Sequence, residues 1–238
     1  AAFFAADSAI FEHCDDSSGA VGMVFDCDGC DLFVRYASDY PDKSRLIDRI
    51  IVLCESDDYG VRDVLIKSAH RFLSKDDLRA FAERIEERSQ LPGESWHWLR
   101  SLASVARQLK DASLYQKAQR AIRPELSDSA KVDIAEIHLE NGDVKAALLW
   151  LEGAERDYRI ENLLLVTHQR LGNQDEAAEI AWHSFRGYRD KNRLATLLSI
   201  IGENQRERVV ADEIRTILDS ERLSEVDAAF LGVVKQLL

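Results

Sequence analysis

Proline and glycine are scarce in this chain. Three prolines and eleven glycines occur among its 238 residues. A β-rich protein needs frequent turns, which these residue types supply, so their scarcity favours long helices joined by short links. The chain also lacks a run of about eighteen apolar residues, the length that a membrane-spanning helix needs. Hydrophobic residues still make up 46% of the chain, which is enough to bury a sizeable core.

An excess of basic residues is missing as well. The formal net charge is −12, and because nucleic acids and anionic membranes bind basic surfaces, we expect neither as a partner. Four cysteines in a large, charged chain predict reduced thiols and a cytoplasmic location. The apolar start, residues 1–6, is short and has no basic leader, so it does not resemble a signal peptide.

Three glycines lie thirty residues apart, at Gly142, Gly172 and Gly202. Each ends an apolar helical stretch and is followed by residues that can begin another helix. Other positions recur in the same register, as the pairs Tyr158 and Tyr188, Arg159 and Arg189, Asn162 and Asn192, Leu164 and Leu194, and Ala181 and Ala211. A fixed period of this size is the signature of stacked helical hairpins, which usually bind other molecules along a curved face.

Capping residues locate several helix ends. Gly142 followed by Asp143 combines a left-handed C-terminal glycine with an N-cap carboxylate, as in a tight helix–helix turn. Ser74 reads as the N-cap of an apolar helix, with Asp77 three residues later. Capping boxes are expected at two further helix starts, formed by Asn173 with Glu176 and by Asn204 with Glu207.

These patterns predict an all-α protein with about fourteen helices and no strand. We expect an α-solenoid of stacked antiparallel helical hairpins. An irregular helical-hairpin region covers 1–125, and a repeat array covers 126–238 and continues from the first region.

The region 127–217 resembles tetratricopeptide repeats. When Gly142 is set on the mid-hairpin glycine of that motif, its three small-residue positions hold Ala135, Ala147 and Ala154. The second and third repeats keep one alanine each, at Ala177 and Ala195. The period of the motif is usually about 34 residues, and its tryptophan and closing proline are missing here. The resemblance implies paired helices that approach closely at these alanines.

Two turn segments, Cys14–Gly19 and Glu55–Gly60, precede further helical stretches. Together with the hairpins after residue 127, they make nearly the whole chain similar to an uncharacterised family of bacterial helical proteins, a domain-of-unknown-function family. This resemblance implies a helical array that continues before residue 1. It implies no activity.

Arginine and asparagine recur on the repeat array at positions that face the concave surface in tetratricopeptide-like hairpins. The predicted binding residues are Arg159, Asn162, Gln169, Arg170, Arg189 and Asn192. Arginine forks suit carboxylates, and asparagine amides suit peptide backbones. We therefore expect a protein- or peptide-binding module with no catalytic activity, cofactor or metal of its own. The alternative is a purely structural role, in which the array serves only as a spacer or an oligomer contact.

The stretch Met23–Gly29 offers an enzymatic alternative. It is similar to the first motif of haloacid dehalogenase-like phosphatases, an apolar strand ending in Asp-x-Asp-Gly. The resemblance implies Asp26 as the nucleophile, Asp28 as the general acid, and Mg²⁺ to neutralise charge. The next residues, Cys30 and Asp31, depart from that pattern, and no alternation of strands and helices follows. The simpler interpretation is an exposed helix face.

Cysteine, histidine and tryptophan patterns are each open to two interpretations. Cys27 and Cys30 have the spacing of a zinc or redox pair, with His13 and Cys14 as the nearby ligands, but packing is the favoured role. The equivalent pair His138 and His168 is interpreted as packing rather than as a metal site. Trp96 and Trp98 point to different helix faces, so at most one of them belongs to the core seam and the other can be a binding anchor.

Overall fold

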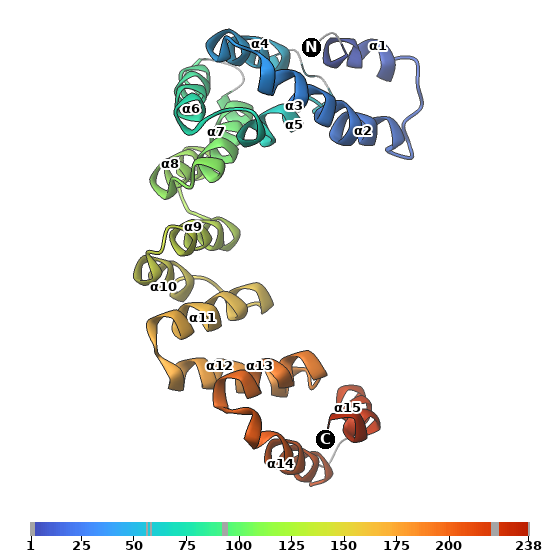
Figure 1. Cartoon of the computed structure of the whole chain (residues 1–238), viewed down its shortest axis with the longest axis vertical. Coiled ribbons are helices and arrows are strands. Elements are labelled where there is room, and N and C mark those ends of the chain that lie inside the picture. Colours follow the sequence, from blue (N-terminus) through green and yellow to red (C-terminus); the bar gives the residue numbers. More distant parts are fainter. Residues whose placement is uncertain (1–2, 56, 58, 92–94, 220–223, 238) are drawn as a thin grey trace. The chain divides into compact units, whose positions relative to one another are not determined.

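The computed structural model describes residues 3–55, 57, 59–91, 95–219 and 224–237 (Figure 1). Over these residues every element is a helix, and no strand occurs. The series α1 to α15 fits the expectation of about fourteen helices, and neighbouring helices pack on one another as in a helical solenoid. The predicted fold class is confirmed. Of the helices in the described ranges, none has the length and apolarity needed to cross a bilayer.

The chain divides into two compact units, Ala1–Ala130 and Lys131–Leu238. The first unit holds α1 (Asp7–Phe11), α2 (Ala20–Val24), η2 (Phe25–Gly29), α3 (Cys30–Asp39), α4 (Lys43–Glu55), α5 (Asp63–Lys67), α6 (Lys75–Ser89), α7 (Ser95–Leu109) and α8 (Ala112–Ile122), with short 3-10 turns η1 (Phe4–Ala6) and η3 (Ala69–Arg71). The boundary falls in the first turn of α9 (Asp128–Glu140). The second unit continues with α10 (Val144–Glu152), α11 (Tyr158–Leu171), α12 (Gln174–Gly187), α13 (Lys191–Ile201), η4 (Glu203–Gln205), α14 (Arg206–Leu218) and α15 (Glu225–Leu237).

In the first unit, α6 packs on α7, α7 packs on α8, and α5 packs against α7. Helix α6 shows why these residues form this element. Its buried side chains follow helical spacing, at Leu78, Phe81, Ala82 and Ile85. Ser74 accepts a hydrogen bond from the backbone of Asp77, whose carboxylate accepts one in return from the backbone of Ser74. The capping interaction predicted for this start is thus present as a full capping box.

In the second unit, α10 packs on α11, α11 on α12, and α12 on α13. Small residues are fully buried where helices approach, including Ala135, Ala147 and Ala177. Larger side chains fill the space around them, among them Phe185, Leu194, Leu197, Leu198 and Val210. One hydrophobic cluster therefore extends from α9 to α15 within this unit.

The first two repeat glycines make the same turn. Gly142 and Gly172 have φ values of 80° and 78°, the left-handed conformation that glycine adopts without a Cβ penalty. The backbone N–H of Asp143 donates to the carbonyl of His138, and that of Asn173 donates to His168, both at 2.9 Å. These bonds close a Schellman turn at each helix end. Asp143 then caps α10 through Ala146, as predicted.

The third repeat turn differs. Gly202 has φ 106° and ψ 133°, and η4 follows it before α14 begins at Arg206. The capping box expected for Asn204 is wrong, because that residue lies inside η4. The one expected for Asn173 is also wrong: Asn173 is the N-cap of α12, but its amide lies 3.2 Å from the His168 ring and makes no cap bond. The thirty-residue period of the sequence therefore continues to Gly202, but the turn geometry repeats only at Gly142 and Gly172.

Candidate functional site

Arg159, in the first turn of α11, forms ion pairs with two carboxylates of α9. Its Nη2 donates to Asp133 and to Glu136 of α9, both at 2.9 Å, and about half of the side chain stays exposed. Burial acts to lower the pKa of this guanidinium, but the hydrogen bonds to Asp133 and Glu136 outweigh it and raise the pKa above its usual value. Arg159 thus connects α11 to α9.

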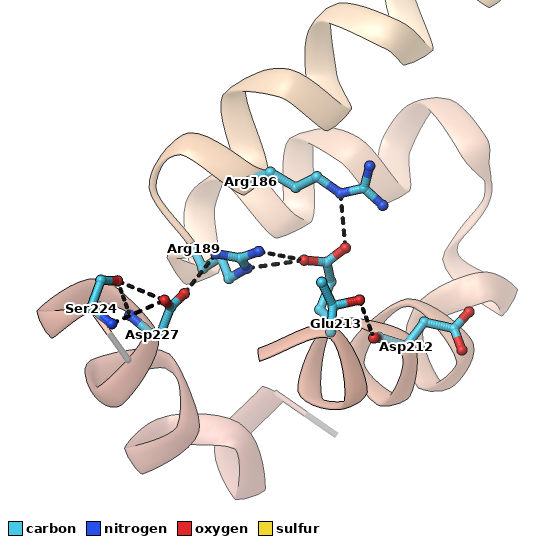
Figure 2. A network of polar contacts seen from close by, with 7 residues as sticks. Arg186, Arg189, Asp212, Glu213, Ser224 and Asp227 are labelled. Atoms are coloured by element: carbon cyan, nitrogen blue, oxygen red, sulfur yellow. Dashed lines mark hydrogen bonds and ion pairs between the residues drawn. The ribbon is translucent and has the colours of Figure 1, made fainter. Parts of the chain in front are cut away.

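Arg189, thirty residues later, makes its ion pairs in the opposite direction along the chain. Its Nε donates to Glu213 Oε2 of α14 at 2.9 Å, and its Nη1 donates to Asp227 of α15 at 2.7 Å. Arg186 donates to the other oxygen of Glu213 at 2.9 Å, so both oxygens are paired (Figure 2). Glu213 is 1% exposed and Arg189 13% exposed. This ionic network is centred on the buried Glu213 and holds Arg186 of α12, and Arg189 just after that helix, to α14 and α15.

A capping box begins α15 beside this network. The hydroxyl of Ser224 donates to Asp227 at 2.7 Å, and the backbone N–H of Asp227 donates back to that hydroxyl at 3.1 Å. The hydrogen bond from Ser224 lowers the pKa of Asp227, and Arg189 lowers it further. The carboxylate therefore stays ionised at lower pH than an ordinary aspartate.

The two predicted residues at the end of α11 also lie away from the two asparagines. Arg170 donates from Nη1 to the carbonyl of Leu139 at 3.0 Å, near the C-terminus of α9, and the same carbonyl also accepts from the backbone N–H of Gly142. Gln169 is exposed and lies outside the pocket described next. Neither residue faces Asn162 or Asn192 across that pocket.

Asn162 of α11 and Asn192 of α13 line one pocket, which we call the α11–α13 pocket. Its apolar floor consists of three buried side chains, Leu165, Ile180 and Ala181. Its polar rim includes the two asparagines with Glu161, Ser184, Arg193 and Thr196, and Tyr158 lies beside them. The cavity volume is about 60 Å³. That is far below the roughly 300 Å³ at which small-molecule sites begin, so the pocket suits a single side chain.

Sequence reasoning missed Arg193 as a member of this site. Its guanidinium carbon lies 5.0 Å from the ring centroid of Tyr158 and 5.2 Å from that of Tyr188. Its Nη1 donates to the carbonyl of Ser184 at 2.9 Å. The recurrence of tyrosine at period thirty is visible in the sequence, but nothing there shows that both rings receive the same arginine. These contacts hold the guanidinium in place at the pocket rim.

Glu161 was also missed. Its carboxylate lies 2.9 Å from Nδ1 of His183 on α12, and only 16% of the Glu161 side chain is exposed. The pair connects the pocket wall on α11 to α12. No spacing rule relates residues 161 and 183, so the contact follows from the hairpin geometry alone.

The structure does not give the phosphatase motif its required setting. Asp26 and Asp28 lie in η2, a single π-helical turn between α2 and α3, and both side chains are exposed. The family with that motif places its aspartates at the end of a parallel strand, and the described part of the chain has no strand. In the same part, no group of three or more His, Cys, Asp or Glu side chains is arranged to hold a metal ion.

Neither the pair Cys27 and Cys30 nor the pair His138 and His168 forms a shared site. Cys27 is exposed, whereas Cys30 is buried with its thiol 3.2 Å from the Ser68 hydroxyl. The Nδ1 atom of His138 faces the Asp143 carboxylate at 3.5 Å, in the position where His168 faces Asn173. Each histidine thus contacts the residue directly after the glycine that ends its own helix.

A family model described as a family of unknown function (DUF6880) matches residues 1–146. No curated protein and no solved structure matches the chain. The matched residues include the whole first unit and reach the start of α10, and the α11–α13 pocket lies after them.

Proposed function

The chain belongs to the family of unknown function (DUF6880), and we propose that it is a non-catalytic module that binds a peptide segment of a partner protein in the α11–α13 pocket. The observation that carries this proposal is the placement of Asn162 and Asn192, equivalent residues of successive hairpins, on the rim of one pocket. The proposal includes tetratricopeptide-like hairpins over 127–217. It also includes a bacterial source and a cytoplasmic location. The four free cysteines support the cytoplasmic location.

The asparagine pair suits a peptide backbone. An amide side chain offers two donors and an acceptor, so two amides that line one pocket can pair with N–H and C=O groups of an extended segment. Both asparagines are exposed. Their spacing in sequence matches that of the repeat, so the hairpin stack presents them in register.

The floor of the pocket suits an apolar side chain. Leu165 and Ile180 are each 8% exposed and Ala181 is 2% exposed, so the remaining exposed area of these residues faces the cavity that they line. Covering it with a methyl or methylene group of a ligand removes apolar area from water, which stabilises a complex by about 25 cal/mol per Å². Small volume and polar rim together favour a single aliphatic side chain flanked by backbone.

Arg193 gives the pocket a fixed cation. A guanidinium held between two rings loses little conformational entropy when it binds a carboxylate. Its Nε lies 3.6 Å from Asp190, a looser contact than its bond to Ser184. A ligand carboxylate next to the aliphatic side chain would therefore strengthen binding.

The test is selection of peptides from a displayed random library on the wild-type chain. We expect the selected peptides to bind the double variant Asn162→Ala, Asn192→Ala at least about tenfold more weakly, a loss of about 1.4 kcal/mol. Gln169→Ala is the matched control, because it removes an exposed amide of the same helix outside the pocket.

Unchanged affinity of the double variant for the selected peptides would contradict the assignment of the pocket. Helical circular dichroism of both variants should equal that of the wild type, since the altered side chains are exposed. A chain that selects no peptide and self-associates in light scattering would instead support the spacer role.

A further inference from the structure

Two pockets of the first unit meet at one arginine, Arg100 of α7. One pocket, between α5 and α7, is lined by Lys67 and Arg100 together with Asp63, Ser101 and Ser104, and has a volume of about 190 Å³. The other, between the start of α7 and the end of α8, has a volume of about 310 Å³. Its lining includes Arg100, Trp96, Gln119, Ile122, Arg123 and Glu125. We call this joined area the Arg100 surface.

Positive charge collects on the Arg100 surface of an acidic chain. Lys67, Arg100 and Arg123 are exposed, and no carboxylate among the described residues pairs with any of them. Two carboxylates line the same pockets, Glu125 and Asp63. One oxygen of Asp63 is buried without a hydrogen bond and lies 3.9 Å from Nδ1 of His97, so this carboxylate is turned toward α7. Three cations face two anions in a molecule whose net charge is −12.

Trp96, which lines the larger of the two pockets, is exposed. It is 58% exposed, while Trp98, two residues later, is 2% exposed and packs in the core. The expectation that only one of the two tryptophans joins the core is therefore confirmed. The guanidinium carbon of Arg100 lies 4.7 Å from the Trp96 ring centroid, one helical turn away. Stacking of this kind fixes the planar guanidinium and leaves its N–H groups available for a carboxylate.

We propose that the Arg100 surface binds an acidic peptide segment of a partner protein, in which Asp or Glu alternates with apolar residues. Carboxylates of the segment pair with Arg100 and Arg123, and an apolar side chain covers Trp96 and Ile122. Charge complementarity selects this occupant, because the planar guanidinium of arginine forms bidentate pairs with carboxylates. Tryptophan is enriched at binding hot spots, so an apolar residue next to each carboxylate suits Trp96. The site is separate from the α11–α13 pocket and does not depend on it.

The test measures fluorescence anisotropy of a fluorescein-labelled peptide of alternating Glu and Leu on the full chain, with Ser–Leu and Lys–Leu peptides alongside. We expect the Glu–Leu peptide to bind in a salt-dependent manner and the other two to bind at least about tenfold more weakly. Arg123→Gln should weaken binding of the Glu–Leu peptide about tenfold. Arg120→Gln should leave it unchanged, because Arg120 is an exposed arginine of α8 outside the pocket lining, and the charge change is identical.

Trp96→Ala provides the second arm, with an expected loss of about tenfold and unchanged helical circular dichroism because Trp96 is an exposed side chain. Equal weakening by Arg120→Gln and Arg123→Gln would mean general charge attraction and would overturn the proposal. Equal binding of the Ser–Leu peptide, or no binding of the Glu–Leu peptide, would also overturn it. The Glu–Leu peptide also carries the aliphatic side chain and carboxylate proposed for the α11–α13 pocket, so the double variant Asn162→Ala, Asn192→Ala is measured with the same peptide. Loss of binding in Trp96→Ala and Arg123→Gln, with the double variant binding like the wild type, supports the Arg100 surface. Loss in the double variant alone would assign the peptide to the α11–α13 pocket and overturn this proposal, so failure at either site is distinguishable from failure at the other.

Discussion

At the scale of single residues, equivalence in the repeat does not mean equivalence in role. Arg159 and Arg189 occupy the same register position. Arg159 pairs with partly exposed carboxylates of α9, whereas Arg189 pairs with Glu213, which is almost completely buried. A buried carboxylate that loses its partner pays the full cost of its desolvation, while a surface ion pair is nearly neutral in free energy. The two arginines should therefore differ widely in their effect on stability.

We predict that Arg189→Ala lowers the free energy of unfolding by about 3 kcal/mol, because it leaves Glu213 with Arg186 alone. Arg159→Ala should cost less than about 1 kcal/mol. Urea denaturation followed by circular dichroism measures both. Equal losses would show that Glu213 is hydrated in solution. Substituting both arginines to test binding would therefore confuse loss of a contact with loss of structure.

Asp227 should give the chain a specific acid sensitivity. Its pKa in the folded state is lowered from about 3.8 by Ser224 and Arg189. A lowered folded pKa contributes stability that is fully present above the unfolded pKa and is lost as pH falls through the folded one. We predict that wild type loses more stability than Asp227→Asn as pH falls from about 5 to 3.

Urea midpoints at several pH values provide the measurement. The gap between wild type and Asp227→Asn should narrow steadily as the pH decreases. A gap that stays constant would mean that Asp227 has the same pKa in the folded and unfolded chain.

At the scale of elements, the turns decide how far local sequence rules carry. Gly142 and Gly172 are followed by polar N-cap residues and adopt the predicted left-handed turn. Gly202 is followed by Glu203, with the asparagine one residue later at Asn204, and its backbone differs: η4 replaces the tight turn. A glycine adopts several conformations at similar energy, so the residue alone predicts that a turn occurs and leaves its type to the packing of the flanking helices.

We predict that Gly202→Ala is more destabilising than Gly172→Ala. The left-handed conformation of Gly172 costs an alanine about 1 kcal/mol, with no atom within 4 Å of the added Cβ. At Gly202 the backbone lies in a region that other residues rarely enter, so the cost should reach about 2–3 kcal/mol. The exposed Asn204 side chain, whose Oδ1 would lie 2.6 Å from the added Cβ, can turn away at little cost. Thermal unfolding of the two variants tests the order, and a reversed order would show that η4 rearranges freely.

At the scale of the whole molecule, the sequence predicts the architecture better than the site. Helical periodicity and scarce turn residues are enough for an all-α fold, because local spacing decides which face is buried. Ion pairs depend on distances between helices that no local rule contains. That is why three predicted arginines, Arg159, Arg170 and Arg189, proved to bond neighbouring helices, and why Arg193 was missed. The two asparagines met because hairpin stacking preserves register.

The compact units suggest that the repeat part folds independently. The hydrophobic cluster from Val132 to Phe230 lies entirely within Lys131–Leu238, and the Ser127 hydroxyl accepts from the backbone of Ala130 at the start of α9. We predict that a fragment covering 127–238 is helical by circular dichroism and melts cooperatively. A helical signal that declines gradually with temperature would contradict this, because it would show that the cluster needs the first unit.

Arg159 and Arg189 pair with carboxylates that differ in burial, and this difference affects how the chain can diverge over evolutionary time. Arg159 can drift to lysine or glutamine in one descendant without compensation elsewhere, since its partners remain hydrated. Arg189 and Glu213 are mutually constrained, and a descendant that changes one has to change the other in the same lineage. Among relatives of this chain, we expect the residues equivalent to Arg189 and Glu213 to change together. We expect the residue equivalent to Arg159 to change on its own.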